Sequence, residues 1–533
     1  MRPIDDVNKS LLGLYCNDPK FLRELNEVQQ YYDFYEGRCF TGDEEDYNDD
    51  KGQLWRVKER DYKPTREVRN MVKKLMKKQG RFMTSVPPTL VLSSVQGDVD
   101  RERIDAKRGI IEDILKEGKF WNKFSKGFMD CTIGKRVLLA MIIDVDENGV
   151  PNPDNPLRFR FYTMPEFTYE FDPNDVDKLV KVQIAYQDEQ TVGKIQQEQR
   201  WHKWTYDIRE DGYCWCVYEI VDGTNTTAFI DVMASPLVGN EDTEEDVQSQ
   251  QVELRQEWNT GLTQIPCKVI FNDGLTGDVR GHSDIKDLMD MAMDYNKTIS
   301  DYRDALRFKM FEQPVFIDAD SNSLDGIKIA PNALIDLKSD PALGNGVNAS
   351  STAKAQMLSS TFNFAAPADS YLTRLKQDMY EIMEQPMPEQ LVDVPSGKAL
   401  KMIYYDLITR CEEKWSEWDE ALEWLVGLIE EAIITYGLYS DRPEIDTMTL
   451  ETVTVWQHNY PIPDDEADNK QVGIAEVQAN VRSKKSYIEE FSNVEDAEAE
   501  YQQILDETNQ MNEINNAMLG LDQAEYDGND NEE

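Results

Sequence analysis

Side chains that could bind a metal ion or act as nucleophiles are few and widely spaced. The seven cysteines are odd in number and lack the Cys-x-x-Cys spacing of zinc or redox sites. They are Cys16, Cys39, Cys131, Cys214, Cys216, Cys267 and Cys411. The three histidines, His202, His282 and His458, include no pair at ligand spacing. We therefore expect the cysteines to pack as ordinary side chains, and we expect no metal site and no cofactor.

Motifs that would define an enzyme are also missing from the sequence. It has no Gly-x-x-x-x-Gly-Lys-Ser/Thr loop, which excludes a P-loop ATPase of the usual kind, and no Gly-x-Ser-x-Gly elbow. Asp and Glu number 102, so carboxylate pairs arise throughout the chain. Counting residues therefore leaves a metal-dependent nuclease as a remote alternative. We expect no catalytic residues.

The formal net charge of −45 opposes DNA binding, because phosphate contacts need cationic side chains that displace counterions. Composition is compatible with a soluble protein that has a very acidic tail, and equally with a surface that DNA passes without adhering. One stretch, residues 56–81, is strongly basic. A helix there would spread these charges around much of its surface. Three roles for the charges remain open: contact with nucleic acid, exposure to solvent, or ion pairs with acidic neighbours.

Hydropathy gives no sign of a membrane protein. No run of about 18 apolar residues is present, and the first residues lack the apolar core of a signal peptide. We therefore expect the chain to be made and kept in a cytoplasm.

The pattern of apolar residues and turn signals along the sequence predicts an α+β fold. Helices are expected at 21–32, 102–117 and 119–131. Strands are expected where β-branched and aromatic residues cluster between turn signals: Val137–Ile143, Leu157–Phe161, Val180–Tyr186, Trp201–Tyr206, Cys214–Val221, Thr227–Val232 and Ile265–Asn272.

The second half of the sequence changes to long helices. Ser283 is a good N-cap for an amphipathic helix that runs to about Phe308, roughly 37 Å at 1.5 Å per residue. A mixed insert follows, with strands expected at Pro314–Ile317 and Ala333–Leu337, and then a second amphipathic helix at about 368–385. Prolines make 386–395 a loop.

Beyond that loop, Ser396 is expected to cap one continuous helix that ends near Gly437. A strand at Thr449–His458, short polar helices and a disordered tail from Asp522 complete the chain.

This order of elements resembles the portal, or head-to-tail connector, proteins of tailed bacteriophages, in particular the branch found in long-tailed phages of Gram-positive hosts. Five segments in order carry the resemblance: Asn70-Met-Val-Lys through Arg81-Phe-Met to Pro87-Pro-Thr-Leu90; Ile265-Pro266 through Asn272 to Ser283-Asp284-Ile285 and Asp294-Tyr295-Asn296; Ser300-Asp301-Tyr302-Arg303-Asp304; Ser396-Gly397-Lys398-Ala399-Leu400; and His458-Asn459-Tyr460-Pro461-Ile462-Pro463. The N-terminal region is long and has extra acidic loops, which suggests additions to its first domain.

The resemblance implies a phage portal fold: an α/β wing, a two-helix stem, a small α/β clip, a long radial helix and a helical crown. The implied boundaries are 1–282 for most of the wing, 283–308 and 368–385 for the stem helices, 309–367 for the clip, 386–395 for a tunnel loop, 396–460 for the long helix and the wing return strand, and 461–533 for the crown and its acidic tail.

The resemblance also implies a function without catalysis. Generally twelve subunits form a ring at one capsid vertex, through which double-stranded DNA is packaged and ejected without sequence-specific binding. The expected partners are other copies of the chain, the terminase large subunit, a head-completion adaptor, and the major capsid and scaffold proteins, with no membrane. The expected location is the virion, reached from the host cytoplasm during assembly.

Candidate site residues follow from these regions. In the tunnel loop, the residues expected to face DNA are Glu389, Gln390, Leu391 and Asp393. On the stem helices, the charges that could face the bore are Lys297, Arg303, Arg307, Arg374 and Lys376.

The alternative function is that of an acidic scaffold or adaptor protein built from long helices. Such a protein would need neither the strand-rich first half nor the insert between two helices.

Overall fold

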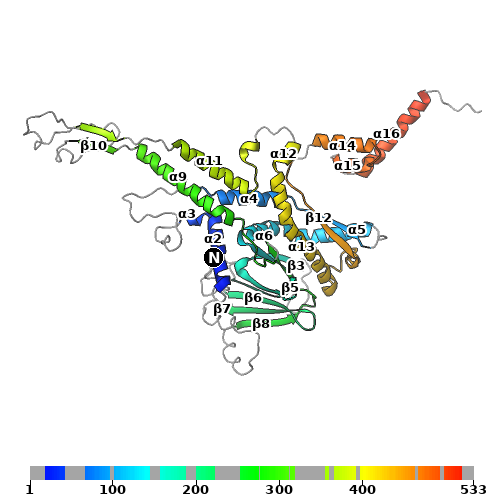
Figure 1. Cartoon of the computed structure of the whole chain (residues 1–533). Helices are drawn as coiled ribbons and strands as arrows, with labels where there is room; N and C mark the ends of the chain where they lie inside the picture. The colour runs from blue at the N-terminus through cyan, green and yellow to red at the C-terminus, as the bar shows by residue number, and fades with distance from the viewer. Residues whose placement is uncertain are drawn as a thin grey trace, which may run out of the picture. The chain divides into compact units, whose positions relative to one another are not determined.

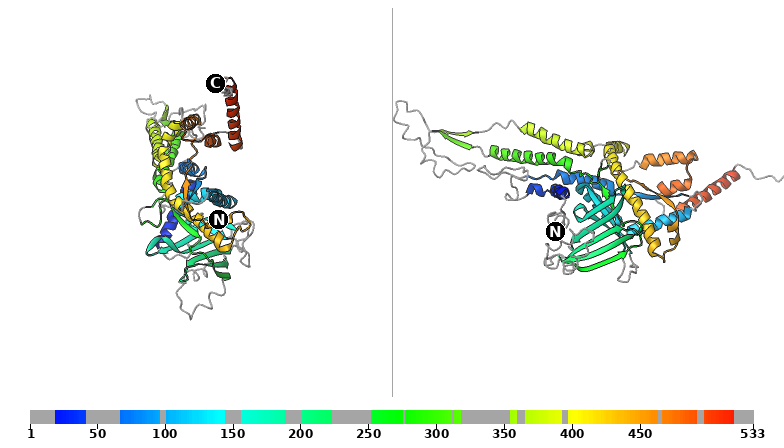
Figure 2. Two further views of the ribbon diagram at one scale, coloured as in Figure 1. Left: turned by 90° about the vertical axis from the view of Figure 1, so that its right-hand side faces the viewer. Right: turned by 60° about the horizontal axis from the view of Figure 1, so that its bottom comes forward.

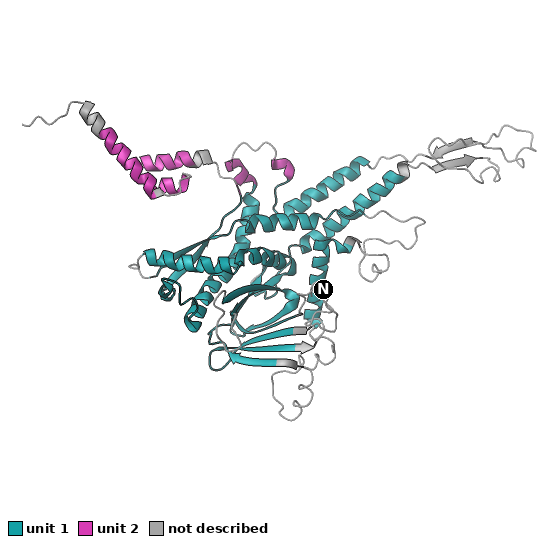
Figure 3. Ribbon diagram, turned by 180° about the vertical axis from the view of Figure 1, so that it is seen from behind, with its two compact units in different colours: residues 1–387, 404–461 teal, residues 388–403, 462–533 magenta. Residues whose placement is uncertain are grey.

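A computed structural model describes residues 19–41, 67–95, 101–143, 156–187, 200–222, 252–274, 277–310, 313–317, 354–358, 365–391, 397–462, 466–491 and 497–518. The chain combines helices and strands, which confirms the α+β expectation. It divides into two compact units, drawn in teal and magenta in Figure 3. Unit 1 comprises residues 1–387 and 404–461, and unit 2 comprises residues 388–403 and 462–533.

Two antiparallel sheets form the lower part of unit 1 as Figure 1 is drawn. The larger sheet is a five-stranded meander in sequence order: β4 Phe167–Asp172, β5 Asp175–Gln187, β6 Arg200–Ile208, β7 Cys214–Asp222 and β8 Val252–Asn259. The smaller sheet has the order β3-β2-β9, with β2 Arg136–Ile143, β3 Leu157–Thr163 and β9 Cys267–Phe271. Strands β4 and β8 were not expected, and the strand expected at 227–232 lies outside the described residues.

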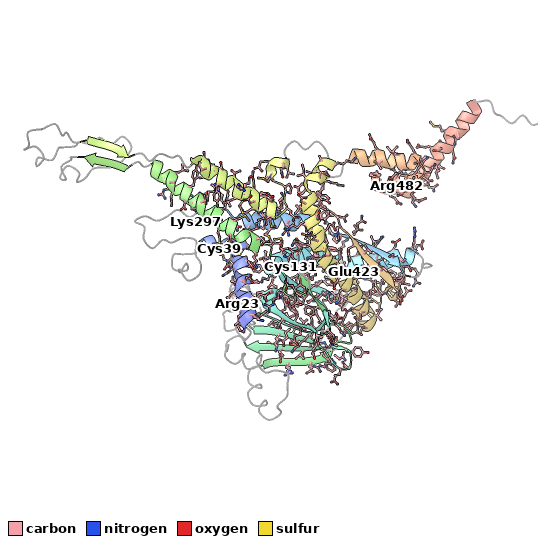
Figure 4. All side chains as sticks on the ribbon, viewed as in Figure 1. Arg23, Cys39, Cys131, Lys297, Glu423 and Arg482 are labelled. Carbon is pink, nitrogen blue, oxygen red and sulfur yellow. The ribbon has the colours of Figure 1, made fainter. Side chains whose placement is uncertain are left out.

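One core of unit 1 lies where helix α6 (Phe120–Gly134) covers the smaller sheet. This helix follows α5 (Arg101–Glu117) and contacts both β2 and β3. Its Phe124 ring stacks on Trp415 with centroids 5.7 Å apart and meets Trp418 edge-on at 4.8 Å. Cys131 of the same helix is buried as well, and Figure 4 labels it. Because aromatic pairs at such distances are favourable, this cluster joins α6 to the long helix that carries both tryptophans.

A two-stranded ribbon joins segments from opposite ends of unit 1. Strand β1 (Thr89–Ser94) pairs with β12 (Thr452–Gln457), so that Leu90 lies opposite Trp456. Both side chains are buried, while the alternate positions point outward. This pairing joins the segment after the long helix to the strand that follows α4 (Met71–Thr84).

Three helices from the first 90 residues pack together on the other side of α6. These are α2 (Pro19–Glu36), the short α3 (Arg38–Thr41) and α4 (Met71–Thr84). Asn70 caps α4 by accepting a hydrogen bond from the Lys73 N–H. Tyr32 donates a hydrogen bond to the carboxylate of Asp130 at 3.1 Å, which ties α2 to α6.

The two expected amphipathic helices form an adjacent pair. A short 3₁₀ turn, Lys286–Leu288, leads into α9 (Met289–Met310), so the α-helix begins several residues after Ser283. The second helix, α11, spans Ala365–Ile382. Between them, β10 (Gln313–Ile317) confirms the strand expected at Pro314–Ile317. It pairs with β11 (Lys354–Leu358), a strand that was not expected, and the strand expected at 333–337 lies outside the described residues.

The expectation of one continuous helix from 396 to 437 is wrong. Helix α12 (Gly397–Ile403) stops at Tyr404, and α13 (Tyr405–Tyr436) begins after it. The Tyr404 backbone has φ −90° and ψ 3°, between the helical and extended regions, and its ring stacks on Phe82 of α4 at 5.2 Å. The expected end is confirmed, because Gly437 closes α13 with φ 60°.

Unit 2 contains helices from the last third of the chain. Besides α12 and the 3₁₀ turn η8 (Pro388–Leu391), it comprises α14 (Glu466–Gln478), α15 (Lys484–Phe491) and α16 (Ala497–Met518). Lys485 of α15 forms an ion pair with Glu498 of α16. The tail expected to be disordered lies outside the described residues.

Candidate channel elements

Helices α9 and α11 lie side by side in each view of the molecule (Figures 1 and 2). Their contact is apolar and continues into α2 and α4. From α9 it takes Ala292, Tyr295 and Ile299, and from α11 Leu375 and Met379, all at most 7% exposed. One stripe of each rod is therefore buried within unit 1, and the remaining surface of each rod is polar or partly exposed.

Two polar side chains interrupt the buried side of α9 and hold an incoming segment. The Arg69 N–H donates to Asn296 Oδ1 at 2.7 Å, and the Glu67 N–H donates to Ser300 Oγ at 3.0 Å. Asn296 and Ser300 are each 1% exposed. Because a buried backbone N–H without an acceptor is costly, these side chains fix residues 67–70 against the helix. The sequence contains this signal as the polar residues Asn296, Ser300 and Asp304, four positions apart on the buried side of the helix.

The start of α9 is joined to α13 by a buried ion pair. Asp284 Oδ1 accepts from Lys414 Nζ at 3.0 Å, and the two side chains are 1% and 2% exposed. Asn272 donates to the same carboxylate at 2.9 Å, and Gln79 of α4 donates to its other oxygen at 2.8 Å. Burial alone would raise the pKa of Asp284, but Lys414 and Arg410 outweigh it and hold that pKa well below its ordinary value.

Sequence reasoning missed this network, although it included Asp284 among the family-like residues. The available signal was Lys414, a charged residue beside Cys411 and Trp415 on the apolar side of a long helix. A lysine at such a position needs a buried anion. The sequence does not reveal which of 102 carboxylates supplies it.

Four of the five charges expected to face a bore are exposed. Lys297, labelled in Figure 4, is exposed on α9, as are Arg303 and Arg307. Arg374 of α11 is exposed, and Lys376 is half-buried.

Two of these arginines contact carboxylates. Arg303 reaches Glu67 at 3.3 Å, so it also contacts the segment held by Asn296 and Ser300. Arg374 is 79% exposed and lies 4.0 Å from Asp378 one turn later. Exposed pairs of this kind contribute little to stability, which leaves the side chains available to a ligand or a neighbouring molecule.

The loop expected after α11 begins as a fixed segment. Gln385 Nε2 donates to the carbonyl of Leu75 at 2.8 Å, and Lys78 Nζ donates to the carbonyl of Pro386 at 2.8 Å. Both contacts lie within unit 1 and anchor the segment to α4. In unit 2, Glu389 and Gln390 are exposed and Leu391 is half-buried in the 3₁₀ turn, whereas Asp393 lies outside the described residues.

Within the described ranges, no three side chains of His, Cys, Asp or Glu lie close enough together to hold a metal ion. None of the helices described there is long and apolar enough to cross a membrane.

A comparison with protein families identifies the class of the chain. The model of the family described as "Phage portal protein, SPP1 Gp6-like" matches residues 18–513, which is nearly the whole chain. The chain therefore belongs to the SPP1 Gp6-like family of phage portal proteins. No curated protein matches it.

Proposed function

We propose that this chain is the portal subunit of a tailed phage, of the branch found in long-tailed phages of Gram-positive hosts. In this proposal about twelve copies form a ring at one capsid vertex. DNA enters and leaves the capsid through the ring, which binds the terminase large subunit and a head-completion adaptor and contacts the major capsid and scaffold proteins. The single observation that carries the proposal is the family match over residues 18–513.

Helix geometry supports a duplex-sized channel. If one rod from each of about twelve subunits lines the bore at about 10 Å spacing, the circle of helix axes has a radius of roughly 19 Å. Subtracting a helix half-width of about 5 Å leaves a hole about 28 Å across, wider than the roughly 20 Å of duplex DNA. A head-to-tail interface that repeats at a fixed rotation closes into such a ring.

We assign the elements to the parts of a portal subunit in the order of the sequence. Helices α9 and α11 are the stem, with β10 and β11 in the clip between them. Residues 386–395 are the tunnel loop, α13 returns to the wing, and α14 to α16 form the crown. An acidic loop tip that includes Glu389 would repel phosphate, so that the loop would grip DNA sterically and allow it to slide.

We propose no catalytic step for this chain. Incubation of the purified protein with plasmid DNA and Mg²⁺ or Mn²⁺ is expected to leave the plasmid intact. Metal-dependent cleavage that copurifies with the protein would support the nuclease alternative.

Ring formation is the direct test of the portal function. Native mass measurement and end-on negative-stain images of the purified full chain should show a closed assembly of about a dozen copies with a central hole. A chain that stays monomeric under assembly conditions would contradict the proposal, and an open filament would favour a scaffold protein.

A further inference from the structure

Helix α4 has two opposite surfaces. One is buried and includes Val72, Leu75 and Met76, which pack in the core shared with α2 and α9, together with the buried Phe82 and Met83. The other bears four cations, Lys74, Lys77, Lys78 and Arg81, at steps of three and four residues. Such steps place side chains in a row on one helix face. We call this row the basic stripe; it contrasts with the expectation that the charges of 56–81 would be spread around the helix.

The basic stripe lacks carboxylate partners in the part of the chain that the structure describes. Among the described residues, no ion pair involves any of these four side chains, whereas the neighbouring Lys73 pairs with Glu36 at 2.7 Å. Lys74 and Lys78 instead lie over the same ring, that of Tyr380, at 5.7 and 5.6 Å. Burial lowers the pKa of Lys78, and the nearby Lys74 lowers it further. Like charges are therefore concentrated here, in a chain whose net charge is −45.

The basic stripe lies beside the elements assigned to the channel. Tyr380, over which two of its lysines lie, belongs to α11. Lys78 also donates to the carbonyl of Pro386, where the tunnel loop begins. Lys74, Lys77 and Arg81 are exposed, so their charged ends are accessible from solvent in a single chain.

We propose that the basic stripe binds backbone phosphates of the double-stranded DNA that passes the ring; this rests on the proposed function. From Lys74 to Arg81 the stripe is about 10 Å long at 1.5 Å per residue. One DNA strand presents a phosphate about every 3.4 Å along the axis, so the stripe spans roughly three of them. Lysine and arginine on a helix surface bind phosphate without reading bases, which suits DNA of any sequence.

Carboxylates of a neighbouring subunit are the competing partner for the same charges. Position favours DNA, because the stripe borders the end of α11 and the start of the tunnel loop. Removing the charges of the basic stripe should have a different effect for each partner. Loss of phosphate contacts weakens DNA binding and its salt dependence, whereas loss of subunit contacts weakens the ring.

The test uses the full-length protein, with Lys77→Gln/Arg81→Gln as the variant and Lys116→Gln, an exposed cation on α5, as the control. Binding to a fluorescent duplex is measured by anisotropy over a range of salt concentrations, and assembly by native mass. Each lost phosphate contact reduces the slope of log Kobs against log salt by about 0.9, so the double variant should lose about 1.8. The control should keep the slope, and all three proteins should form the same assembly.

The outcomes separate the two proposals. An unchanged slope in the double variant overturns the DNA role of the basic stripe. Loss of the ring together with an unchanged slope also overturns it and assigns the stripe to a subunit interface. If the wild-type chain forms no ring, the portal function fails, yet the slope measured on that protein still decides whether the stripe binds phosphate. Lys77→Arg should retain the wild-type slope, since it keeps the charge.

Discussion

Lys414 lies in the first third of α13, and its side chain is almost completely buried. It contacts Asp284, Asn272 and Asp273, so one side chain links the start of α9 to the loop after β9. Because removing a single partner leaves a buried charge uncompensated, such a pair is sensitive to one-sided change.

We predict that Lys414→Met lowers the free energy of unfolding by about 3–5 kcal/mol. The reason is that Asp284 stays buried with much of its compensating charge removed. Urea denaturation provides the measurement. Arg103→Met, which removes an exposed pair with Asp446, is the control and should cost at most about 1 kcal/mol. Asp284→Asn/Lys414→Met should be more stable than Lys414→Met, and a double variant as unstable as the sum of both single changes would contradict the argument.

His458 provides a second residue-scale prediction, because both ring nitrogens face carboxylates. Nδ1 lies 2.7 Å from Glu412 and Nε2 lies 3.0 Å from Asp419, while the ring stacks on Trp415 at 4.6 Å. Burial lowers the pKa of His458, but hydrogen bonds to Asp419 and Glu412 raise it overall above 6.5. The stabilisation should therefore be complete below pH 6.5 and disappear as the pH rises through the higher folded-state pKa.

The measurement is the free energy of unfolding of wild type and His458→Gln across that pH range. The difference should be largest in mild acid and should shrink at alkaline pH. A difference that stays constant with pH would show that the ring contributes through stacking alone.

At the scale of elements, the turn from β9 into α9 depends on one glycine. Gly281 has φ 70°, and a Cβ there would lie 2.4 Å from the Lys135 carbonyl oxygen and 3.0 Å from that of Asn272. Neither backbone atom can move without disturbing β2 or the bond from the Asn272 N–H to the Lys135 carbonyl. The turn places Asp284 beside Asn272, so its shape also sets where α9 begins.

We predict that Gly281→Ala destabilises unit 1 by more than about 1 kcal/mol, the cost expected from an incompatible backbone alone. Gly212→Ala is a matched control, since Gly212 has φ 80° but open space around its Cβ position. Thermal unfolding of both variants separates steric overlap from backbone strain. Equal losses in the two variants would rule out a role for the close contact.

Periodic elements could be predicted from the sequence, and elements set by tertiary contacts could not. Helix α5 and strands β2, β3 and β7 lie within a few residues of the expected ranges, because each carries an apolar pattern: periodic in α5, and a continuous apolar run in β2, which is buried on both faces. Strand β8 was missed because its residues, Val-Glu-Leu-Arg-Gln-Glu-Trp-Asn, are largely polar on an edge strand. The interruption at Tyr404 was missed because its cause includes Phe82, more than 300 residues earlier.

The candidate site was predictable to a similar extent. The two rods and the proline-rich connection after them follow from hydrophobic spacing and from proline chemistry. Their attachment does not, since the acceptors for residues 67–70 and the partners of Lys414 come from distant parts of the chain. The sequence contains many similar polar side chains that could be these partners, and only the fold determines which of them meet.

At the scale of the whole molecule, the proposed ring makes each tunnel loop one of about twelve identical parts around the bore. Its first residues are bound to α4, and Lys78 holds the carbonyl of Pro386. A change confined to the loop should therefore affect DNA without affecting assembly.

We predict that deletion of residues 388–393 leaves rings intact but reduces DNA packaging or retention several-fold. Ring formation is checked by native mass, and packaging by protection of DNA from nuclease in assembled particles. A deletion of similar length in residues 238–252, a polar acidic segment, is the control. Unchanged packaging in the first variant would refute the gate role.

The pairing of α9 with α11 has a consequence for how this protein could diverge. Since β10 and β11 are hydrogen-bonded to each other, the chain leaves the rods and returns to them at nearly the same place. A segment whose two ends are neighbours can be lengthened, shortened or exchanged without moving its supports. Residues 318–353 could therefore be exchanged to suit a different attachment partner while the rods and their core stay unchanged.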